Sequence, residues 1–320
     1  MRGFQDALLS ASRIATMTSP AIMAWQRASI ERLLASARPD GGWGYQSNHE
    51  PSAEPTAFAC LALAMAEPDA DPIQLGLEWL ARGQHDNGAV AVAPRITAPC
   101  WPTSLAALAW LKARSSGGTS YPGQTHRAVD WLLHTEGLTL KSDAAIYGHD
   151  TQMIGWPWVS ATHSWIEPTA YSVLALCAAG KSNHPRVREA VKLLLNRAIP
   201  EGGWNYGNSR VFQNNLRPFP AQTGIALAAL AGEAMCESID SAIRYLHSEL
   251  ERIRTPMSLG WGVIGLSAWN ERPFSADDYL TECAARLDGK PNHPVFDSLL
   301  LLADAEQCTL TTLPEAANHG

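Results

Sequence analysis

A four-residue phrase, Glu-Pro-Thr-Ala, occurs twice in this chain and each time precedes a run of small and apolar residues. The two copies are Glu54–Ala57 and Glu167–Ala170, and degenerate forms stand at 101–104, 221–224 and 295–298. Proline in the first turn of a helix loses no hydrogen bond, so each phrase predicts the start of a helix that is apolar on nearly all sides. Helices of that kind belong in the interior of a protein.

Segments of a second kind lie between these apolar runs. They share the order small residue, aliphatic, polar, large residue, leucine, with charges on one face and aliphatic side chains on the other. That pattern predicts helices half exposed to water, which would form an outer layer. The copies are 29–33, 76–80, 128–132, 190–194 and 242–246, and a sixth outer helix is expected around 275–280, where Ser275 and Asp278 form a capping pair.

Self-similarity at roughly 50 residues is typical of an array of helical hairpins, each of which buries its apolar face only against its neighbours. An open array would need polar capping repeats, yet the last inner helix, Asp297–Ala305, is as apolar as the first. We therefore predict an all-α fold, an α/α toroid (α6/α6 barrel) of six hairpins in inner and outer layers. The fifth inner helix, about 258–269, fits worst, because its three glycines lower helix propensity.

Length and composition bound what this toroid does. The chain has 320 residues, of which 46% are hydrophobic, and we expect an extension at 1–20, one toroid domain at 21–310 and a tail at 311–320. A net charge of −7 without a basic cluster argues against a nucleic-acid partner. No apolar run has the length of a transmembrane segment and the first residues lack a signal peptide pattern, so we expect a cytoplasmic protein, with peripheral membrane attachment left open.

Several turns resemble the repeats of squalene-hopene and oxidosqualene cyclases. Trp79–Gln84 with Gly88 is similar to their glutamine-and-tryptophan repeat, Asp40–Tyr45 and Glu201–Tyr206 carry its other half, and Pro220–Gly224 is similar to a recurrent helix start. The chain is thus identified as a member of the terpenoid cyclase and protein prenyltransferase superfamily, over essentially its whole length. The resemblance implies a toroid whose inner helices surround an apolar cavity, and a hydrophobic, isoprenoid-like small molecule as partner.

The resemblance also implies a catalytic acid. Class II terpene cyclases begin protonation from a motif Asp-x-Asp-Asp-Thr-Ala whose middle aspartate is the acid; in this chain Glu167 takes its place, and tryptophan and proline replace the flanking aspartates. Glu54 stands in the same relation to its own helix. A dry pocket would raise the pKa of either carboxyl, and His163 and His49, a few residues upstream, could orient them. Alternatively, each glutamate only favours the positive end of a helix dipole.

The stretch from 149 to 165 is rich in aromatic and histidine residues. Loops that enter inner helices surround one mouth of a toroid, so this stretch is expected to line a pocket, where aromatic faces stabilise cationic carbon; filling the core is the alternative. The expected substrate-binding residues are His149, Asp150, Trp156, Trp158 and Trp165 from this stretch, with His49, Trp101, Gln222, Trp261 and Asp297 from the rest of the chain.

We expect no metal and no cofactor. The Asp-x-Cys pair with which protein prenyltransferases hold zinc is absent from this sequence, and so is an aspartate-rich magnesium motif. His149, Asp150 and His163 could approach one another, and zinc accepts such nitrogen and oxygen ligands. The sequence thus favours a class II cyclase-like enzyme that cyclises a polyprenyl substrate by protonation. The alternatives are a non-catalytic toroid that binds a lipid or a partner protein, and a prenyltransferase β-like subunit without the zinc ligands. A protein partner or a homodimer is left open for each of these.

Overall fold

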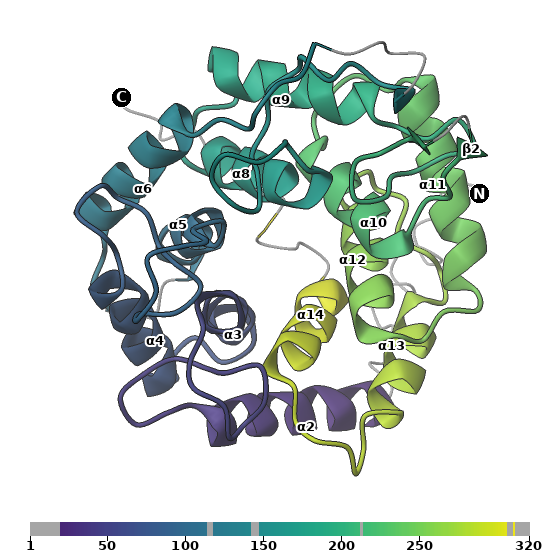
Figure 1. Cartoon of the computed structure of the whole chain (residues 1–320). Coiled ribbons are helices and arrows are strands. Elements are labelled where there is room, and N and C mark those ends of the chain that lie inside the picture. Colours follow the sequence, from purple (N-terminus) through teal and green to yellow (C-terminus); the bar gives the residue numbers. More distant parts are fainter. Residues whose placement is uncertain (1–19, 114–117, 142–146, 212–213, 306–309, 311–320) are drawn as a thin grey trace, which may run out of the picture.

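The computed structural model describes residues 20–113, 118–141, 147–211, 214–305 and 310, and side chains from 24 onward. The expected extension at 1–20, apart from Pro20, and the expected tail at 311–320 lie outside the described residues. Within them, helices form two concentric layers (Figure 1). The inner helices are α3 (Ala53–Ala66), α5 (Thr103–Lys112), α8 (Ile166–Ala178), α10 (Pro220–Ala229), α12 (Pro256–Ser267) and α14 (Pro294–Asp304). The outer helices are α2 (Pro20–Ser36), α4 (Asp71–Arg82), α6 (Pro122–His134), α9 (Pro185–Asn196), α11 (Glu237–Leu250) and α13 (Ala276–Ala285).

The burial of the two layers follows their sequence patterns. In α3 every residue from Pro55 to Leu63 is buried, whereas α4 buries one face, with Ile73, Leu77 and Leu80 among its buried residues. An apolar helix is covered on all sides only when it has neighbours on both flanks and an outer helix behind it. The predicted all-α toroid with inner and outer layers is therefore confirmed. Strands are confined, in the described part of the chain, to the short antiparallel pair β1 (Arg210–Val211) and β2 (Asn214–Asn215).

The ring closes where the last hairpin meets the first. Helix α14 packs against α3 and α2, and α13 packs against α2. Asp297 of α14 is 2% exposed and forms an ion pair with Arg32 of α2, at 2.6 Å from Nη2 to Oδ1, while Arg32 Nε lies 3.2 Å from both carboxylate oxygens. The amide of Asn292 adds a hydrogen bond to the Arg32 carbonyl at 3.0 Å. These contacts give Asp297, expected at a substrate site, a part in closing the ring.

Glycine allows two inner helices to touch. A Cβ atom on Gly224 of α10 would lie 2.1 Å from the Trp261 carbonyl oxygen, and one on Gly265 of α12 would lie 2.5 Å from the Gly224 carbonyl oxygen. Only residues without a Cβ permit so close an approach. Gly265, one of the three glycines that weaken the predicted fifth inner helix, thus lets this helix pack against the fourth, and the helix runs from Pro256 to Ser267.

The threonine of the repeated phrase ties four of the inner helices, α3, α5, α8 and α10, to the loops before them. Thr56 Oγ1 accepts a hydrogen bond from the Trp43 backbone N–H at 2.9 Å and donates to the Ser52 carbonyl at 2.7 Å. One hydroxyl therefore satisfies two backbone groups in a buried position. The same arrangement recurs at Thr103 with Val90 N–H and the Cys100 carbonyl, at Thr169 with both backbone groups of Trp156, and at Thr223 with Trp204 N–H and the Phe219 carbonyl.

Three buried loop tryptophans complete this connection. Their indole N–H groups donate to carbonyls in the last turn of the preceding outer helix, at 2.8 Å for Trp43 to Leu33, 3.0 Å for Trp156 to Leu132 and 2.7 Å for Trp204 to Leu194. The turn needs glycine beside the tryptophan: Gly203 has a φ of 84°, and a Cβ there would lie 2.6 Å from Thr223 Oγ1. The repeated phrase and the Gly-Trp turns are two halves of one structural unit.

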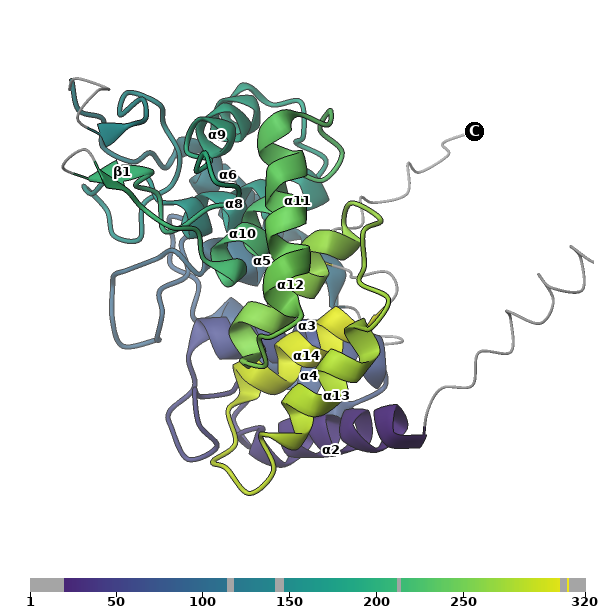
Figure 2. The same cartoon turned by 90° about the vertical axis from the view of Figure 1, so that its right-hand side faces the viewer.

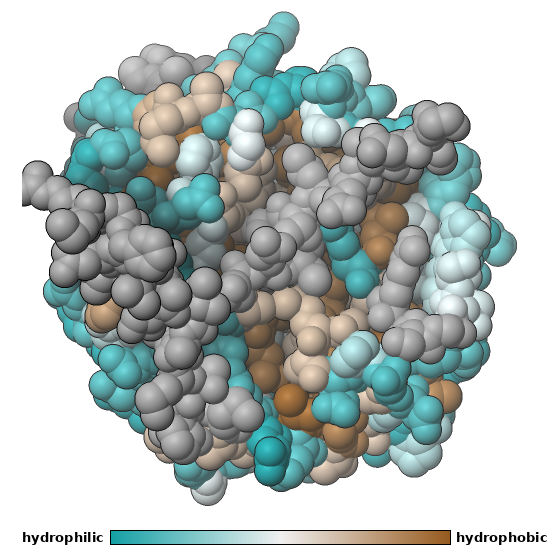
Figure 3. All heavy atoms as spheres, turned by 180° about the vertical axis from the view of Figure 1, so that it is seen from behind, coloured by the Kyte–Doolittle hydropathy of each residue, from teal (hydrophilic) through white to brown (hydrophobic). Residues whose placement is uncertain are grey.

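The two ends of the ring differ. The long loops that lead into the inner helices gather on one side, which we call the mouth (Figure 2). Seen from the opposite side, apolar residues lie toward the middle of the face and hydrophilic residues around its edge (Figure 3). Because the long loops on the mouth side lead into the inner helices, the side chains at the inner-helix N-termini lie at the mouth.

No helix in the described ranges has the length and apolarity needed to cross a membrane.

Candidate active site

Two glutamates mark the mouth end of the ring, Glu167 buried and Glu54 half-buried. Glu54 lies in the first turn of α3 and Glu167 in the first turn of α8, where Glu167 is 9% exposed. The Tyr45 hydroxyl donates a hydrogen bond to Glu54 Oε2 at 2.5 Å, and the Tyr171 hydroxyl donates to Glu167 Oε1 at 3.1 Å. Gln222 of α10 donates from Nε2 to Glu167 Oε2 at 3.4 Å. Glu167 thus has a hydrogen-bond donor on each carboxyl oxygen.

The surroundings of the glutamates favour their protonated forms. Burial, and second the charge of Glu54, raise the pKa of Glu167 to about 7, although the hydrogen bonds from Tyr171 and Gln222 lower it. Burial also raises the pKa of Glu54, against the hydrogen bond from Tyr45. Within the described residues neither carboxylate has a cationic side chain within 4.0 Å. Desolvation without a counter-ion therefore favours the protonated form of both acids.

Aromatic side chains surround the Glu167 side of this pair. Tyr171, one turn after Glu167, contacts Phe58 and Trp261, with ring centroids 6.4 and 5.8 Å away. Trp101 stacks on Tyr171 at 6.2 Å, and Trp158 meets Trp101 edge-on at 4.8 Å. Phe58, Tyr171 and Trp261 are at most 1% exposed and fill the centre of the ring, whereas Trp101 and Trp158 are partly exposed toward the mouth. The carboxyls therefore lie above a packed aromatic floor.

The structure gathers many of the expected site residues and adds three. Glu54, Glu167, Trp101, Trp158, Gln222 and Trp261 come together, and the additions are Tyr45, Phe58 and Tyr171. Tyr171 lies four residues after Glu167 on the same helix, a spacing that places two side chains on one face and could have revealed it. Tyr45 reaches Glu54 from the Gly-Gly-Trp-Gly-Tyr turn, which periodicity does not place.

The histidines expected to orient the two glutamates have other surroundings. His163 is exposed, and its Nδ1 lies 3.2 Å from the Leu138 carbonyl oxygen. His49 is also exposed. Tyr171 and Tyr45 hold the hydrogen-bonding places at Glu167 and Glu54 that we expected these histidines to take. His163 and His49 are close to the two glutamates in the sequence, but that closeness does not make them the hydrogen-bonding partners of the carboxyl groups.

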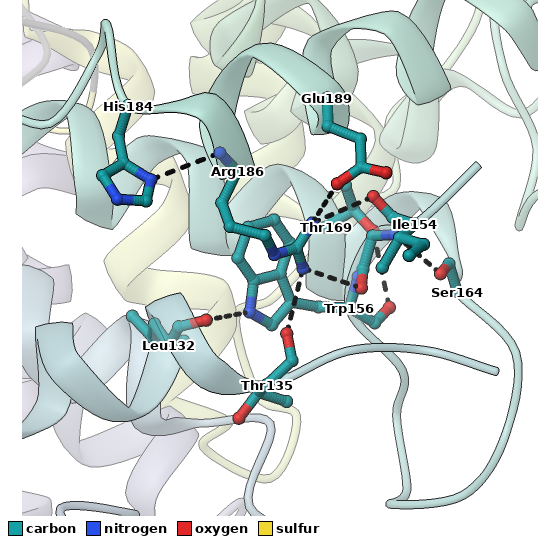
Figure 4. A network of polar contacts seen from close by, with 10 residues as sticks. Leu132, Thr135, Ile154, Trp156, Ser164, Thr169, His184, Arg186 and Glu189 are labelled. Atoms are coloured by element: carbon teal, nitrogen blue, oxygen red, sulfur yellow. Dashed lines mark hydrogen bonds and ion pairs between the residues drawn. The ribbon is translucent and has the colours of Figure 1, made fainter.

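Trp156 lies in a network of polar contacts around Arg186 (Figure 4). It is 2% exposed, and the Arg186 guanidinium lies over its ring, 4.2 Å from the centroid. Arg186 donates to the carbonyls of Thr135, Ile154 and Gly155 and pairs with Glu189 at 3.1 Å. This buried network holds the loop before α8 against α9, although Arg186 Nε itself has no partner. Trp156, expected at the substrate site, is therefore buried within this network.

The remaining expected residues lie near the start of α8. Trp165 precedes the helix and is partly exposed, His149 is 5% exposed, and the backbone N–H of Asp150 donates to Asn196 Oδ1 at 2.8 Å. Among the residues with described positions, no group of three His, Cys, Asp or Glu side chains is spaced to hold a metal ion.

Solved structures with a similar fold include enzymes of different chemistry. A variant of the type II terpene cyclase MstE from Scytonema superposes with a TM-score of 0.56 at 12% identity, covering 88% of this chain and 97% of that one. An α-amylase from Clostridium perfringens gives a TM-score of 0.61 at 9% identity, covering 90% and 98%. A protein from Actinoplanes gives 0.54 at 17% identity, covering 83% and 80%. No family model matches the chain. At these identities the similarity establishes the fold alone.

Proposed function

We propose that this protein is an isoprenoid-processing enzyme that starts the cyclisation of a polyprenyl substrate by protonating it from Glu167. The observation that carries the proposal is the state of Glu167, a buried carboxyl whose pKa is raised to about 7 by burial and by the charge of Glu54. A general acid works best when its pKa lies near the working pH, because it then still holds its proton and gives it up readily. The expected role of Glu54 is to tune that acid.

The proton transfer can be written with the groups at hand. The O–H bond of Glu167 breaks as its proton adds to one carbon of an alkene, whose π electrons form the new C–H bond and leave the positive charge on the other carbon. The carboxylate that remains keeps its hydrogen bonds from Tyr171 and Gln222. Hydrogen bonds to the charged form stabilise the product of the transfer. Tyr171 and Gln222 therefore favour release of the proton.

Aromatic rings are available for the cation that forms. The faces of tryptophan and tyrosine attract a cationic centre within about 6 Å of the ring centroid. Trp101 and Trp158 are partly exposed beside Tyr171, so a substrate entering from the mouth meets them first. Because Phe58, Tyr171 and Trp261 fill the ring centre, the substrate is expected to lie above this floor and to be shorter than one that threads the ring.

One observation favours a second function. The packed centre formed by Phe58, Tyr171 and Trp261 is also what a non-catalytic toroid would have, in which the mouth binds a lipid or a partner protein. The two functions differ in what Glu167 does. In a non-catalytic binding module Glu167 lines the mouth but takes part in no reaction. Its replacement by glutamine then leaves the bound molecule in place.

The test is a product assay with purified protein. Farnesyl and geranylgeranyl substrates and squalene are incubated with the protein, and cyclic products are sought by gas chromatography with mass spectrometry. We expect a product that is lost in Glu167→Gln and reduced in Glu54→Gln, while Glu251→Gln, a change at an exposed glutamate, retains it. Absence of product with every substrate, together with a lipid or protein retained in native mass spectrometry, would favour the binding module. Unchanged turnover in Glu167→Gln would refute the assignment of Glu167 as the proton donor.

A further inference from the structure

A crevice of about 270 Å³ lies at the mouth, between the loops that lead into α8 and α10. Trp165, Tyr206, Leu216 and Phe219 are its aromatic and aliphatic lining residues. Trp165 is the residue before α8 and Phe219 is the residue before α10. Helices α8 and α10 pack against each other in the inner layer (Figure 1). The crevice is therefore placed at the N-terminal ends of two neighbouring inner helices.

This position is close to the candidate acid. Glu167 is two residues after Trp165, and Gln222, which donates a hydrogen bond to Glu167, is three residues after Phe219. An extended chain spans at most about 3.6 Å per residue, so the Cα atoms of Trp165 and Glu167 lie within about 7 Å of each other. A ligand in the crevice is therefore next to the helix turn that carries Glu167.

Three larger cavities border the outer layer instead. Those of about 740, 520 and 450 Å³ include Leu75 of α4, Val129 of α6 and Arg188 of α9, respectively. The described lining of the 270 Å³ crevice contains no residue of an outer helix. Among these four cavities it is the one bordered only by loops that enter inner helices.

Hydrogen bonds hold the walls of the crevice in place. Asn205 is 4% exposed, its Nδ2 donates to the Asn208 carbonyl at 2.9 Å, and its Oδ1 accepts from the Gly207 N–H at 2.9 Å. The Ile166 N–H donates to the Tyr206 carbonyl at 3.0 Å, which fixes this loop to the start of α8. A ligand therefore enters a preformed crevice and does not have to order the loop, which favours binding.

The walls are aromatic and accessible. The Tyr206 side chain is 52% exposed, its ring centroid lies 5.5 Å from that of Phe219, and Trp165 and Phe219 are partly exposed. Burial of such surface against an apolar chain is favourable because both lose contact with water. One water molecule occupies about 30 Å³ in the liquid, so the crevice has room for about nine non-hydrogen atoms. That is close to the size of two prenyl units.

We propose that this crevice binds part of the apolar chain of the substrate that Glu167 protonates, over a length of about two prenyl units. This assignment rests on the proposed function. The centre of the ring is filled by Phe58, Tyr171 and Trp261, so the chain needs another apolar surface beside the acid, and the crevice provides one. Tyr206 and Leu216 are then residues that determine which chain length the enzyme accepts.

The first experiment measures binding without chemistry. Tetrahydrogeraniol has the carbon skeleton of two prenyl units but no double bond, so Glu167 has no alkene to protonate. We expect calorimetry to show that it binds the full chain. Leu216→Trp fills the crevice and Tyr206→Ala removes a wall, so each should weaken binding at least about tenfold, whereas Tyr206→Phe keeps the ring and the affinity. Leu75→Trp, the same change in the 740 Å³ cavity, and Glu167→Gln are the controls that retain affinity.

No binding to the unaltered protein, equal affinity in Leu216→Trp and Tyr206→Ala, or a loss in Leu75→Trp in their place would each overturn the proposal. The second experiment connects the crevice to the reaction. Leu216→Trp should shift the ratio of kcat/KM values at least about tenfold from the geranylgeranyl toward the farnesyl substrate, because the longer chain needs more room. An unchanged ratio also overturns the proposal.

Failure of the crevice and failure of the acid give different results. A product that is lost in Glu167→Gln, with tetrahydrogeraniol binding that ignores Leu216→Trp, refutes the crevice and leaves the proposed function intact. Binding that is lost in Leu216→Trp, with no product from any substrate, refutes the proposed function and with it the catalytic part of this assignment.

Discussion

Replacing Asp297 by asparagine tests how much of the ring's stability depends on its closing ion pair. Asparagine keeps the shape of the side chain and one acceptor oxygen but removes the charge that faces Arg32. Asp297 is 2% exposed and the Arg32 side chain 28% exposed, so the change leaves a partly buried guanidinium without its partner. Removing one partner of a buried pair costs about 3–5 kcal/mol. Because Arg32 reaches water and retains Ser29 as an acceptor, we expect about 3 kcal/mol.

That loss can be converted into a melting temperature. Unfolding releases about 2.1 cal/mol/K of entropy per residue, which for a chain of 320 residues is about 0.7 kcal/mol/K. A loss of about 3 kcal/mol therefore lowers Tm by about 4 °C. Scanning calorimetry measures this shift directly, and chemical denaturation gives the free energy of unfolding. Asp130→Asn, at an exposed aspartate of outer helix α6, serves as the control with the same chemical change.

A double-mutant cycle with Arg32→Gln separates the pair from other effects of each change. If the ion pair closes the ring, the two substitutions are strongly non-additive, since either one removes the same interaction. Asp297→Asn with a free energy of unfolding within about 0.5 kcal/mol of the unaltered protein would refute the reasoning. Additive losses from the two single variants would refute it equally.

Three further predictions follow from features of the ring. Thr223→Val leaves the buried Trp204 N–H without its acceptor, so urea denaturation should show a loss of about 1–3 kcal/mol, and an unchanged midpoint would contradict the structural role of the hydroxyl. Gly224→Ala places a Cβ 2.1 Å from the Trp261 carbonyl oxygen, so a loss of about 3 kcal/mol or more is expected in the same assay, and a stable variant would show that α10 and α12 can separate without cost. Glu167 has a pKa raised from 4.5 to about 7, so the folded state holds its proton where the unfolded state has lost it, and stability falls as pH rises from about 4.5 to about 7, by about 3 kcal/mol in total. Glu167→Gln should remove that part of the pH dependence in parallel unfolding curves, and identical curves for the two proteins would contradict the raised pKa.

The architecture could be predicted because its causes are periodic. Apolar residues on all sides of a helix, as in 53–66, and on one side only, as in 71–82, distinguish inner from outer positions without knowledge of any contact. The closing pair could not be predicted in this way. Arg32 and Asp297 are 265 residues apart, and only the completed ring brings them together. The sequence pattern therefore places Asp297 at a substrate site, whereas the structure pairs it with Arg32.

The candidate site was predicted in part for a related reason. Glu54 and Glu167 repeat the same position at the start of an inner helix, so the sequence placed both at one mouth. Their partners depend on loop conformation: Tyr45 reaches Glu54 across a turn, while His163 contacts the Leu138 carbonyl and His49 is exposed. The threonine of the repeated phrase shows the same limit. Its acceptor and donor roles join backbone groups of an adjacent loop, which no pattern of hydrophobicity describes.

The closing contact between α14 and α2 also determines when this protein is able to fold during its synthesis. The ribosome releases α2 and α3 first, but the helix that covers their flank, α14, emerges more than 200 residues later. Until then the side of α3 that meets α14 stays exposed to water, and a nascent chain with such a surface is prone to aggregate or to bind a chaperone. Arrest of translation before Pro294 should therefore yield chaperone-bound chains, and release after Asp304 compact ones.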